Sequence, residues 1–248
     1  MNHLSSIVSL PVAVAAFGLA AVAVVPNSVR AQNTPDTHRG VSTHQDRGRP
    51  ASSAKQRVDD SVRIIDQMKR NPRLASLLER AKGVFIIPHY GKGGFIVGGE
   101  GGDGVVLAHR NRAWSNPAFF SIAGGSIGAQ AGGEGGSVVM LLTTDKAMDK
   151  FANTNGRWAL NGNAGLTVGS WSDKARTESG KHDVIVWTNT SGLYGGLTAS
   201  VTDVTADRKM DHTYYGRNVS SRDILERNEL SARAEPLRNA LSTRVASR

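Results

Sequence analysis

The sequence predicts an α+β fold: a glycine-rich curved antiparallel β-sheet or barrel flanked by N- and C-terminal helices. The main evidence is residues 83–136, which hold sixteen of the chain's 28 glycines, interleaved with Val, Ile, Phe and Ala. Glycine that alternates with β-branched and aromatic residues indicates strands that bend, bulge or approach another backbone closely. Apolar residues at helical spacing precede and follow this segment. This spacing predicts the flanking helices.

Composition limits both the domain count and the chemistry. A chain of 248 residues that is 39% hydrophobic can bury one sizeable core, so we expect one folded unit with tails. The absence of cysteine excludes disulfides, thiolate metal ligands and a lipid-bearing N-terminal cysteine. A net charge of +9 and a pI near 10.2 favour anionic partners.

The N-terminus has the pattern of an export signal. Residues 7–25 are uncharged and apolar, and Val29-Arg30-Ala31 follows with small residues suited to cleavage. We therefore predict a signal peptide over 1–31, cleaved after Ala31, that directs the protein to the periplasm or cell envelope. The alternative is that the apolar run stays as an uncleaved anchor. Export makes cellular nucleic acid an unexpected partner. Residues 32–54 are polar and rich in Pro, Gly, Ser and Thr, which predicts a disordered tether.

The folded domain is expected over residues 55–248 and begins with an amphipathic helix. Its apolar stripe consists of Val58, Val62, Ile65 and Met68, spaced by four, three and three residues. The basic residues beside the stripe are Lys55, Arg57, Arg63, Lys69 and Arg70. Two interpretations remain open. The helix lies on an anionic membrane, or its stripe packs on the core while the charged face is solvated.

Turn and capping signals predict the remaining elements. A second helix should start at an Asn71 N-cap with Pro72 in first position and stop at Gly83. Strands are predicted at 84–90, 93–100, 104–110, 118–131, 136–143, 164–172, 183–189 and 193–203. The second and third of these should form a hairpin about the glycine-rich turn 101–104, with another reversal at Asn111-Arg112. Further helices are predicted at 144–153, at 221–228 behind a Ser220-x-x-Asp223 capping box, and at 236–245.

Two glycine motifs resemble those of nucleotide-binding and catalytic sites. Each such site requires a helix directly after its motif. Residues 99–104 fit GxGxxG, but the apolar run that follows favours a strand, so no nucleotide site is expected. Residues 124–128 fit the GxSxG of α/β-hydrolases, with Ser126 as nucleophile and Asp183 and His212 downstream in triad order. A secreted serine esterase is therefore the enzymatic alternative, although the residues after Ser126 start a helix poorly.

Other side chains leave binding functions open. The histidines lack metal-ligand spacing, so neither a metal site nor a cofactor is expected. The aromatic residues suit core packing, an interfacial rim or stacking on sugars; they are Trp114, Trp158, Trp171, Trp187, Tyr214 and Tyr215. An envelope structural or glycan-binding protein is thus a third hypothesis.

The sequence also resembles the SYLF domain family, in four blocks that keep the family's order and spacing. The blocks are AKGVFIIP at 81–88, GGFIVGGEGGDGVV at 93–106, WSNPAFFSIAGGSIGAQAGG at 114–133 and SGLYGGLTASVTDVTADRKMDHTYYG at 191–216. The match covers roughly residues 55–245. It implies a non-enzymatic lipid-binding domain with phosphoinositide recognition and, in eukaryotic members, actin binding.

In this family the N-terminal amphipathic helix is implicated in lipid contact. Carried to this chain, the resemblance assigns headgroup contacts to Lys55, Arg57, Arg63, Lys69 and Arg70, and the acyl boundary to Val62, Ile65 and Met68. Eukaryotic members are cytosolic, whereas an exported chain resembles the single-domain bacterial members of the envelope. We therefore expect docking on anionic phospholipid through this helix and the glycine-rich sheet, without actin as a partner.

Overall fold

A computed structural model describes residues 48–94, 97–127, 132–153, 157–160, 165–171, 182–189, 201–227 and 231–242. The chain divides into two units, residues 1–41 and 42–248, and all described residues belong to the second. The predicted signal peptide and residues 32–47 of the predicted tether lie outside the described residues.

Helices come before and after the strands, as predicted. They are α1 (Gly48–Lys69), α2 (Pro72–Arg80), α3 (Asp145–Ala152), α5 (Arg208–Tyr215), α6 (Ser221–Glu226), the short 3₁₀ helix η3 (Ala232–Ala234) and α7 (Glu235–Ser242). Helix α1 begins at Gly48, inside the segment expected to be a tether. The predicted start of α2 is confirmed, because the Asn71 side chain accepts hydrogen bonds from the backbone N–H groups of Arg73 and Leu74.

Within the described residues, nine strands form one curled sheet. They are β1 (Gly83–Gly94), β2 (Val97–Arg110), β3 (Ala113–Trp114), β4 (Ala118–Ile127), β5 (Gly132–Leu142), β6 (Arg157–Ala159), β7 (Val168–Ser170), β8 (Val184–Thr188) and β9 (Val201–Ala206). The strand order is β6-β9-β4-β2-β1-β5-β8-β7, with β3 paired to β2. All pairs are antiparallel except β7 with β8. This confirms the α+β class, and the sheet is open rather than closed over the described strands.

The predicted hairpin about residues 101–104 is wrong. Strand β2 runs straight through these residues, paired with β1 on one side and β4 on the other. A Cβ atom on Gly104 would lie 2.2 Å from the carbonyl oxygen of Ile86, and one on Gly102 would lie 2.5 Å from that of His89. Glycine is needed here for close approach of neighbouring strands and not for a turn. The reversal at Asn111-Arg112 is confirmed, since both residues have positive φ angles of 51° and 63°.

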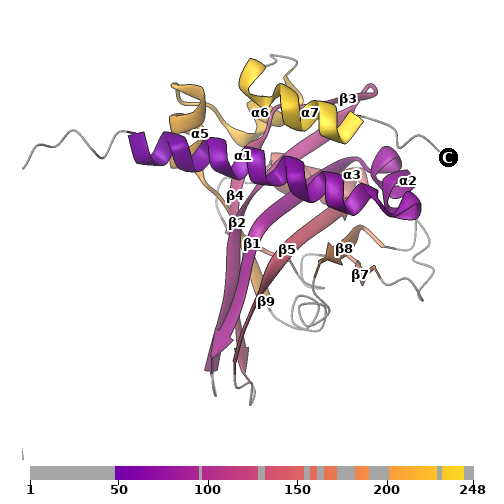
Figure 1. Cartoon of the computed structure of the whole chain (residues 1–248), viewed down its shortest axis with the longest axis vertical. Coiled ribbons are helices and arrows are strands. Elements are labelled where there is room, and N and C mark those ends of the chain that lie inside the picture. The colour runs from indigo at the N-terminus through magenta and orange to yellow at the C-terminus, as the bar shows by residue number, and fades with distance from the viewer. Residues whose placement is uncertain are drawn as a thin grey trace, which may run out of the picture. The chain divides into compact units, whose positions relative to one another are not determined.

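The central strands are buried on both faces. In β1, Phe85 and Ile87 belong to one hydrophobic cluster, while Val84 and Ile86 belong to the other. Residues from α3 and α6 complete the first cluster, and residues from α1, α2 and α7 complete the second. Figure 1 shows α1 lying across the sheet, while β1, β2, β4 and β5 continue beyond the helices as a narrow extension. This extension holds the glycine-rich parts of the four strands.

Four elements were not predicted: α5, η3, β3 and β6. A local signal for α5 was present, because Asp207 caps it by accepting from the backbone N–H of Met210 and Gly216 ends it at a φ of 68°. The capping box of α6 is confirmed, since the Ser220 hydroxyl accepts from the backbone N–H of Asp223.

Candidate functional site

The apolar stripe of α1 packs on the sheet. Val58, Ile65 and Met68 are 2%, 0% and 0% exposed and belong to the second hydrophobic cluster, while Val62 is only partly buried. Of the two interpretations of this helix, core packing is therefore the one that the structure shows. Ile65 and Met68, assigned to an acyl boundary by the family resemblance, do not reach the surface in this conformation.

Two of the predicted headgroup residues are engaged within the fold. The Arg57 side chain is 12% exposed and forms ion pairs with Asp103 on β2 at 3.1 Å and with Asp207 at 3.8 Å. Lys69 is 7% exposed, and its Nζ donates to the backbone carbonyl of Ala240 on α7 at 2.6 Å. Burial lowers the pKa of Lys69, which Asp66 and Glu79 partly offset. These cations fasten α1 to the sheet and to α7.

Two other predicted headgroup residues are exposed but paired along the helix. Lys55 forms an ion pair with Asp59, and Arg63 forms one with Asp60. Asp60 itself is buried and also lies 2.9 Å from Nε2 of His89 on β1. The acids reduce the positive potential of this face, so Lys55 and Arg63 are weaker anchors for an anion than their exposure indicates.

The fifth basic residue, Arg70, lies where α1 meets α2, at the rim of a pocket of about 820 Å³. We call this the corner pocket. Its lining residues are Gln67, Met68, Arg70, Asn71, Pro72, Arg73, Leu74, Trp171, Trp187, Thr188 and Asn189. The helices contribute the two arginines, and β8 with the residue after β7 contributes the two tryptophans.

The chemistry of the corner pocket combines cations and aromatic rings. Arg70 and Arg73 are exposed, and neither forms an ion pair within the described part of the chain. Trp171 is 6% exposed and Trp187 is partly buried. Arginine forks bind phosphate oxygens, and tryptophan prefers the boundary between apolar and aqueous phases. The pocket therefore suits an amphipathic anion.

Only part of this pocket was predicted from the sequence. Met68 and Arg70 were predicted as lipid contacts and the two tryptophans as rim candidates, but they were not expected to lie together and Arg73 was not predicted. A sequence signal for Arg73 was present, because Arg70 and Arg73 flank the Asn71-Pro72 helix start and must therefore lie close together. No sequence pattern placed β8 beside that turn.

The structure does not support a nucleophile elbow at Ser126. Strand β4 continues past Ser126 to Ile127 and β5 begins at Gly132, so strand follows strand where the motif needs a helix. The Asp183 carboxylate accepts hydrogen bonds from Thr144 and Thr167, which hold its pKa below the usual value against the opposing effect of burial. His212 is exposed on α5, and Figure 1 shows α5 and β8 at opposite ends of α1. Asp183 and His212 therefore belong to segments that do not meet as the triad requires.

The described ranges contain neither a cluster of metal ligands nor a membrane-spanning helix. No group of three or more His, Asp or Glu side chains in these ranges is arranged to hold a metal ion. None of the described helices is both long and apolar enough to cross a membrane.

Much of the chain is similar in sequence to known proteins. The family model Ysc84, described as "Las17-binding protein actin regulator", matches residues 123–244. Protein YSC84 of Saccharomyces cerevisiae is 29% identical over 176 residues, which cover 68% of this chain and 37% of that protein. LAS seventeen-binding protein 3 of the same yeast is also 29% identical over 176 residues, 38% of its length.

A human relative gives a similar result. SH3 domain-containing YSC84-like protein 1 of Homo sapiens is 28% identical over 155 residues, which cover 61% of this chain and 45% of that protein. The chain thus matches less than half the length of each of these three relatives. No solved structure matches.

Proposed function

Because this chain belongs to the Ysc84 family, whose domain is also called SYLF, we propose that it binds lipid and docks on anionic phospholipid through the corner pocket. The observation that carries the proposal is the convergence of Arg70 and Arg73, without acidic partners among the described residues, on Trp171 and Trp187. No chemical step is part of this function.

The proposed docking uses two kinds of contact. Arg70 and Arg73 bind lipid phosphate, and each basic residue near an anionic surface contributes about 1 kcal/mol. Trp187, the more exposed of the two tryptophans, lies at the headgroup level, where its apolar ring and its polar N–H group are both accommodated. Lys55 and Arg63 add a weaker field along α1 because each is paired with an acid. Together these contributions to the binding free energy are of the size expected for reversible docking.

In this proposal α1 remains on the sheet while the protein is docked. Burial of Ile65 and Met68 and the ion pairs of Arg57 support that arrangement, since releasing the helix would expose the stripe and break those pairs. Actin and Las17, which the description of the family model mentions, are not proposed as partners because an exported chain would not meet them.

Co-sedimentation with vesicles tests the proposal. We suggest using residues 32–248, because the apolar run at 7–25 would itself bind bilayers. The protein should bind vesicles of phosphatidylcholine with phosphatidylglycerol, should not bind phosphatidylcholine alone, and should bind less as salt rises. Replacing both Arg70 and Arg73 by Ala should weaken binding roughly thirtyfold, as expected for the loss of about 1 kcal/mol per arginine.

The matched control replaces two basic residues that lie away from the pocket. Lys209 on α5 and Arg112 in the β2–β3 turn are both exposed, so the Lys209→Ala, Arg112→Ala chain has the same net charge as the test variant. Its vesicle affinity should remain within about threefold of that of the parent. This small loss reflects the weaker general attraction of a less positive chain to an anionic surface. If both double variants lose the same vesicle affinity, the corner pocket contributes no more than general surface charge does. If the parent does not bind anionic vesicles, the proposal of lipid docking is wrong.

Export of the chain is a separate part of the proposal. Its support is the apolar segment followed by Val29-Arg30-Ala31. N-terminal sequencing of the protein recovered from the envelope of its host should begin at Gln32. A chain that is recovered from the cytoplasm with its first residues intact would contradict export but not lipid binding.

A further inference from the structure

A second pocket, independent of the corner pocket, lies among α5, α6, η3 and the loop before β4. It has a volume of about 590 Å³. We call it the arginine pocket, and its lining residues are Asn116, Thr213, Tyr214, Tyr215, Gly216, Arg217, Asn218, Val219, Asp223, Ile224, Arg227, Ser231 and Arg233. It shares no residue with the corner pocket.

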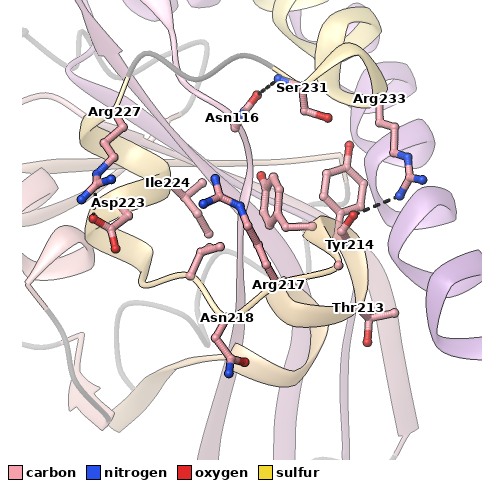
Figure 2. A pocket seen from close by; sticks show the side chains of 13 residues that line it. Asn116, Thr213, Tyr214, Arg217, Asn218, Asp223, Ile224, Arg227, Ser231 and Arg233 are labelled. Atoms are coloured by element: carbon pink, nitrogen blue, oxygen red, sulfur yellow. Dashed lines mark hydrogen bonds and ion pairs between the residues drawn. The ribbon is translucent and has the colours of Figure 1, made fainter.

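Positive charge predominates in this pocket. Arg217 follows α5, Arg227 follows α6 and Arg233 belongs to η3, so three separate segments each supply one arginine. Asp223 is the acid among the lining residues. Figure 2 shows Arg217 near the middle of the view, with Asp223 and Arg227 to one side and Arg233 to the other. The arginines therefore surround the pocket instead of lying along one edge.

Hydrogen bonds join the loop before β4, which lines the arginine pocket, to the segment before η3, to α7 and to α5. The side-chain oxygen of Asn116 accepts from the backbone N–H of Ser231 at 3.0 Å and from Arg238 at 2.7 Å. Arg238 also donates to the carbonyl of Ser231 at 2.9 Å. Next to Asn116 in the chain, the carbonyl of Pro117 accepts a hydrogen bond from the Tyr215 hydroxyl at 2.6 Å. A binding site that is held in this way loses little entropy when a ligand enters.

The guanidinium groups of Arg227 and Arg233 carry more N–H donors than their contacts within the fold use. Arg227 uses Nε in its 2.9 Å ion pair with Asp223, and Arg233 uses Nη1 in its 3.1 Å bond to the carbonyl of Tyr214. A guanidinium carries five N–H donors in a planar fork that matches phosphate oxygens. Asp223 supplies one negative charge against three positive ones, which leaves the lining set cationic.

We propose that the arginine pocket binds a small phosphate-bearing anion, held by Arg217, Arg227 and Arg233. The pocket volume lies within the range of small-molecule sites. The walls include Tyr215, Val219 and Ile224, which accommodate the carbon body of a phosphate ester. The phosphate is carried either by a soluble ester or by a lipid headgroup, and the two sources are separated by experiment.

Titration calorimetry of the full-length chain with inorganic pyrophosphate at low salt tests the site. The parent should bind, and Arg217→Gln and Arg227→Gln should each weaken binding roughly tenfold, the effect of losing one charge-assisted hydrogen bond. Asp223→Asn should act in the opposite direction and tighten binding severalfold, because it removes the opposing charge and frees Arg227. A gain of affinity cannot arise from misfolding.

The matched control is Asp149→Asn on α3, which makes the same charge change at an exposed position outside the pocket. Its affinity for pyrophosphate should equal that of the parent. Absence of binding by the parent, or equal tightening by Asp149→Asn and Asp223→Asn, would overturn the proposal, since the second result reports net charge alone. The Arg70→Ala, Arg73→Ala chain should bind pyrophosphate normally, so failure of lipid docking leaves this test intact.

A vesicle assay then identifies the source of the phosphate. Vesicles of phosphatidylcholine with phosphatidic acid are mixed with residues 32–248 of the parent, of the Arg217→Gln chain and of the Asp223→Asn chain, because the apolar run at 7–25 would itself bind bilayers. If the two variants shift vesicle binding in opposite directions, the pocket takes its phosphate from a lipid headgroup. If only pyrophosphate binding responds, the pocket takes a soluble ester.

Discussion

Arg57 of α1 forms an ion pair with Asp103 of β2 at 3.1 Å, across 46 residues of sequence. The same guanidinium lies 3.8 Å from Asp207 and 5.6 Å from the centre of the Phe119 ring. We predict that Arg57→Ala lowers the free energy of unfolding by about 1–3 kcal/mol, because it leaves acids and a ring face without their cation. Urea unfolding measures the effect.

Lys55→Ala provides the comparison for Arg57, since it removes a cation from the same helix. Its side chain is 76% exposed and, among the described residues, pairs only with Asp59 along the helix. The cost should be below about 0.5 kcal/mol. Equal costs for the two variants would mean that the contacts of Arg57 with the sheet contribute nothing beyond helix charge.

A second prediction compares two glycines of β2. A Cβ atom at Gly104 would lie 2.2 Å from the carbonyl oxygen of Ile86, whereas one at Gly99 meets no described atom within 4 Å. Gly104→Ala should therefore cost about 3 kcal/mol or more or prevent folding, because backbone must shift. Gly99→Ala should be neutral or slightly stabilising, since alanine lowers the entropy of the unfolded chain. Thermal unfolding of both variants checks this, and similar melting temperatures would contradict the strand register.

These glycines also show how far the sequence alone could predict the fold. The start of α2 at Asn71 and that of α6 at Ser220 were predicted because a cap is a contact between near neighbours. The role of Gly104 was misjudged because its constraint comes from Ile86, on a different strand. Glycine suits both a turn and a close approach, so composition could not separate the two.

The candidate site was predictable to a similar extent. Periodicity identified the stripe of α1, but it could not show whether a sheet or a membrane covers that stripe. Trp187 lies far along the chain from Arg70, and only the pairing of β8 with β5 brings it to the corner pocket. Long-range strand pairing is the information that local patterns lack.

A third prediction separates the core role of Ile65 from a membrane role. The side chain is 0% exposed, so Ile65→Ala should lower the free energy of unfolding by about 2–5 kcal/mol. The vesicle affinity of the variant that remains folded should not change. Val62→Ala, at a partly buried position of the same stripe, should cost less. A fall in vesicle affinity for folded Ile65→Ala alone would show that the stripe leaves the core when the protein docks.

The last prediction concerns Asp211, which is 1% exposed on α5. One carboxylate oxygen accepts from the backbone N–H of Phe119 at 2.9 Å, and the other, Oδ2, has no partner in the described part of the chain. Burial raises the pKa of Asp211 to about 7; the bond from Phe119 opposes this shift and the nearby Asp207 adds to it. The folded state therefore holds this proton more tightly than the unfolded state, in which the pKa is near 4.

It follows that Asp211 stabilises the folded protein most below pH 4 and loses this contribution as pH rises through 7, by up to about 4 kcal/mol. Asp211→Asn keeps an acceptor for Phe119 but cannot ionise. The variant should be more stable than the parent at pH 8, and the difference should shrink towards pH 5. Urea unfolding at both pH values checks the sign, and an Asn variant that is less stable at pH 8 would show that the carboxylate is ionised and stabilising in the folded state.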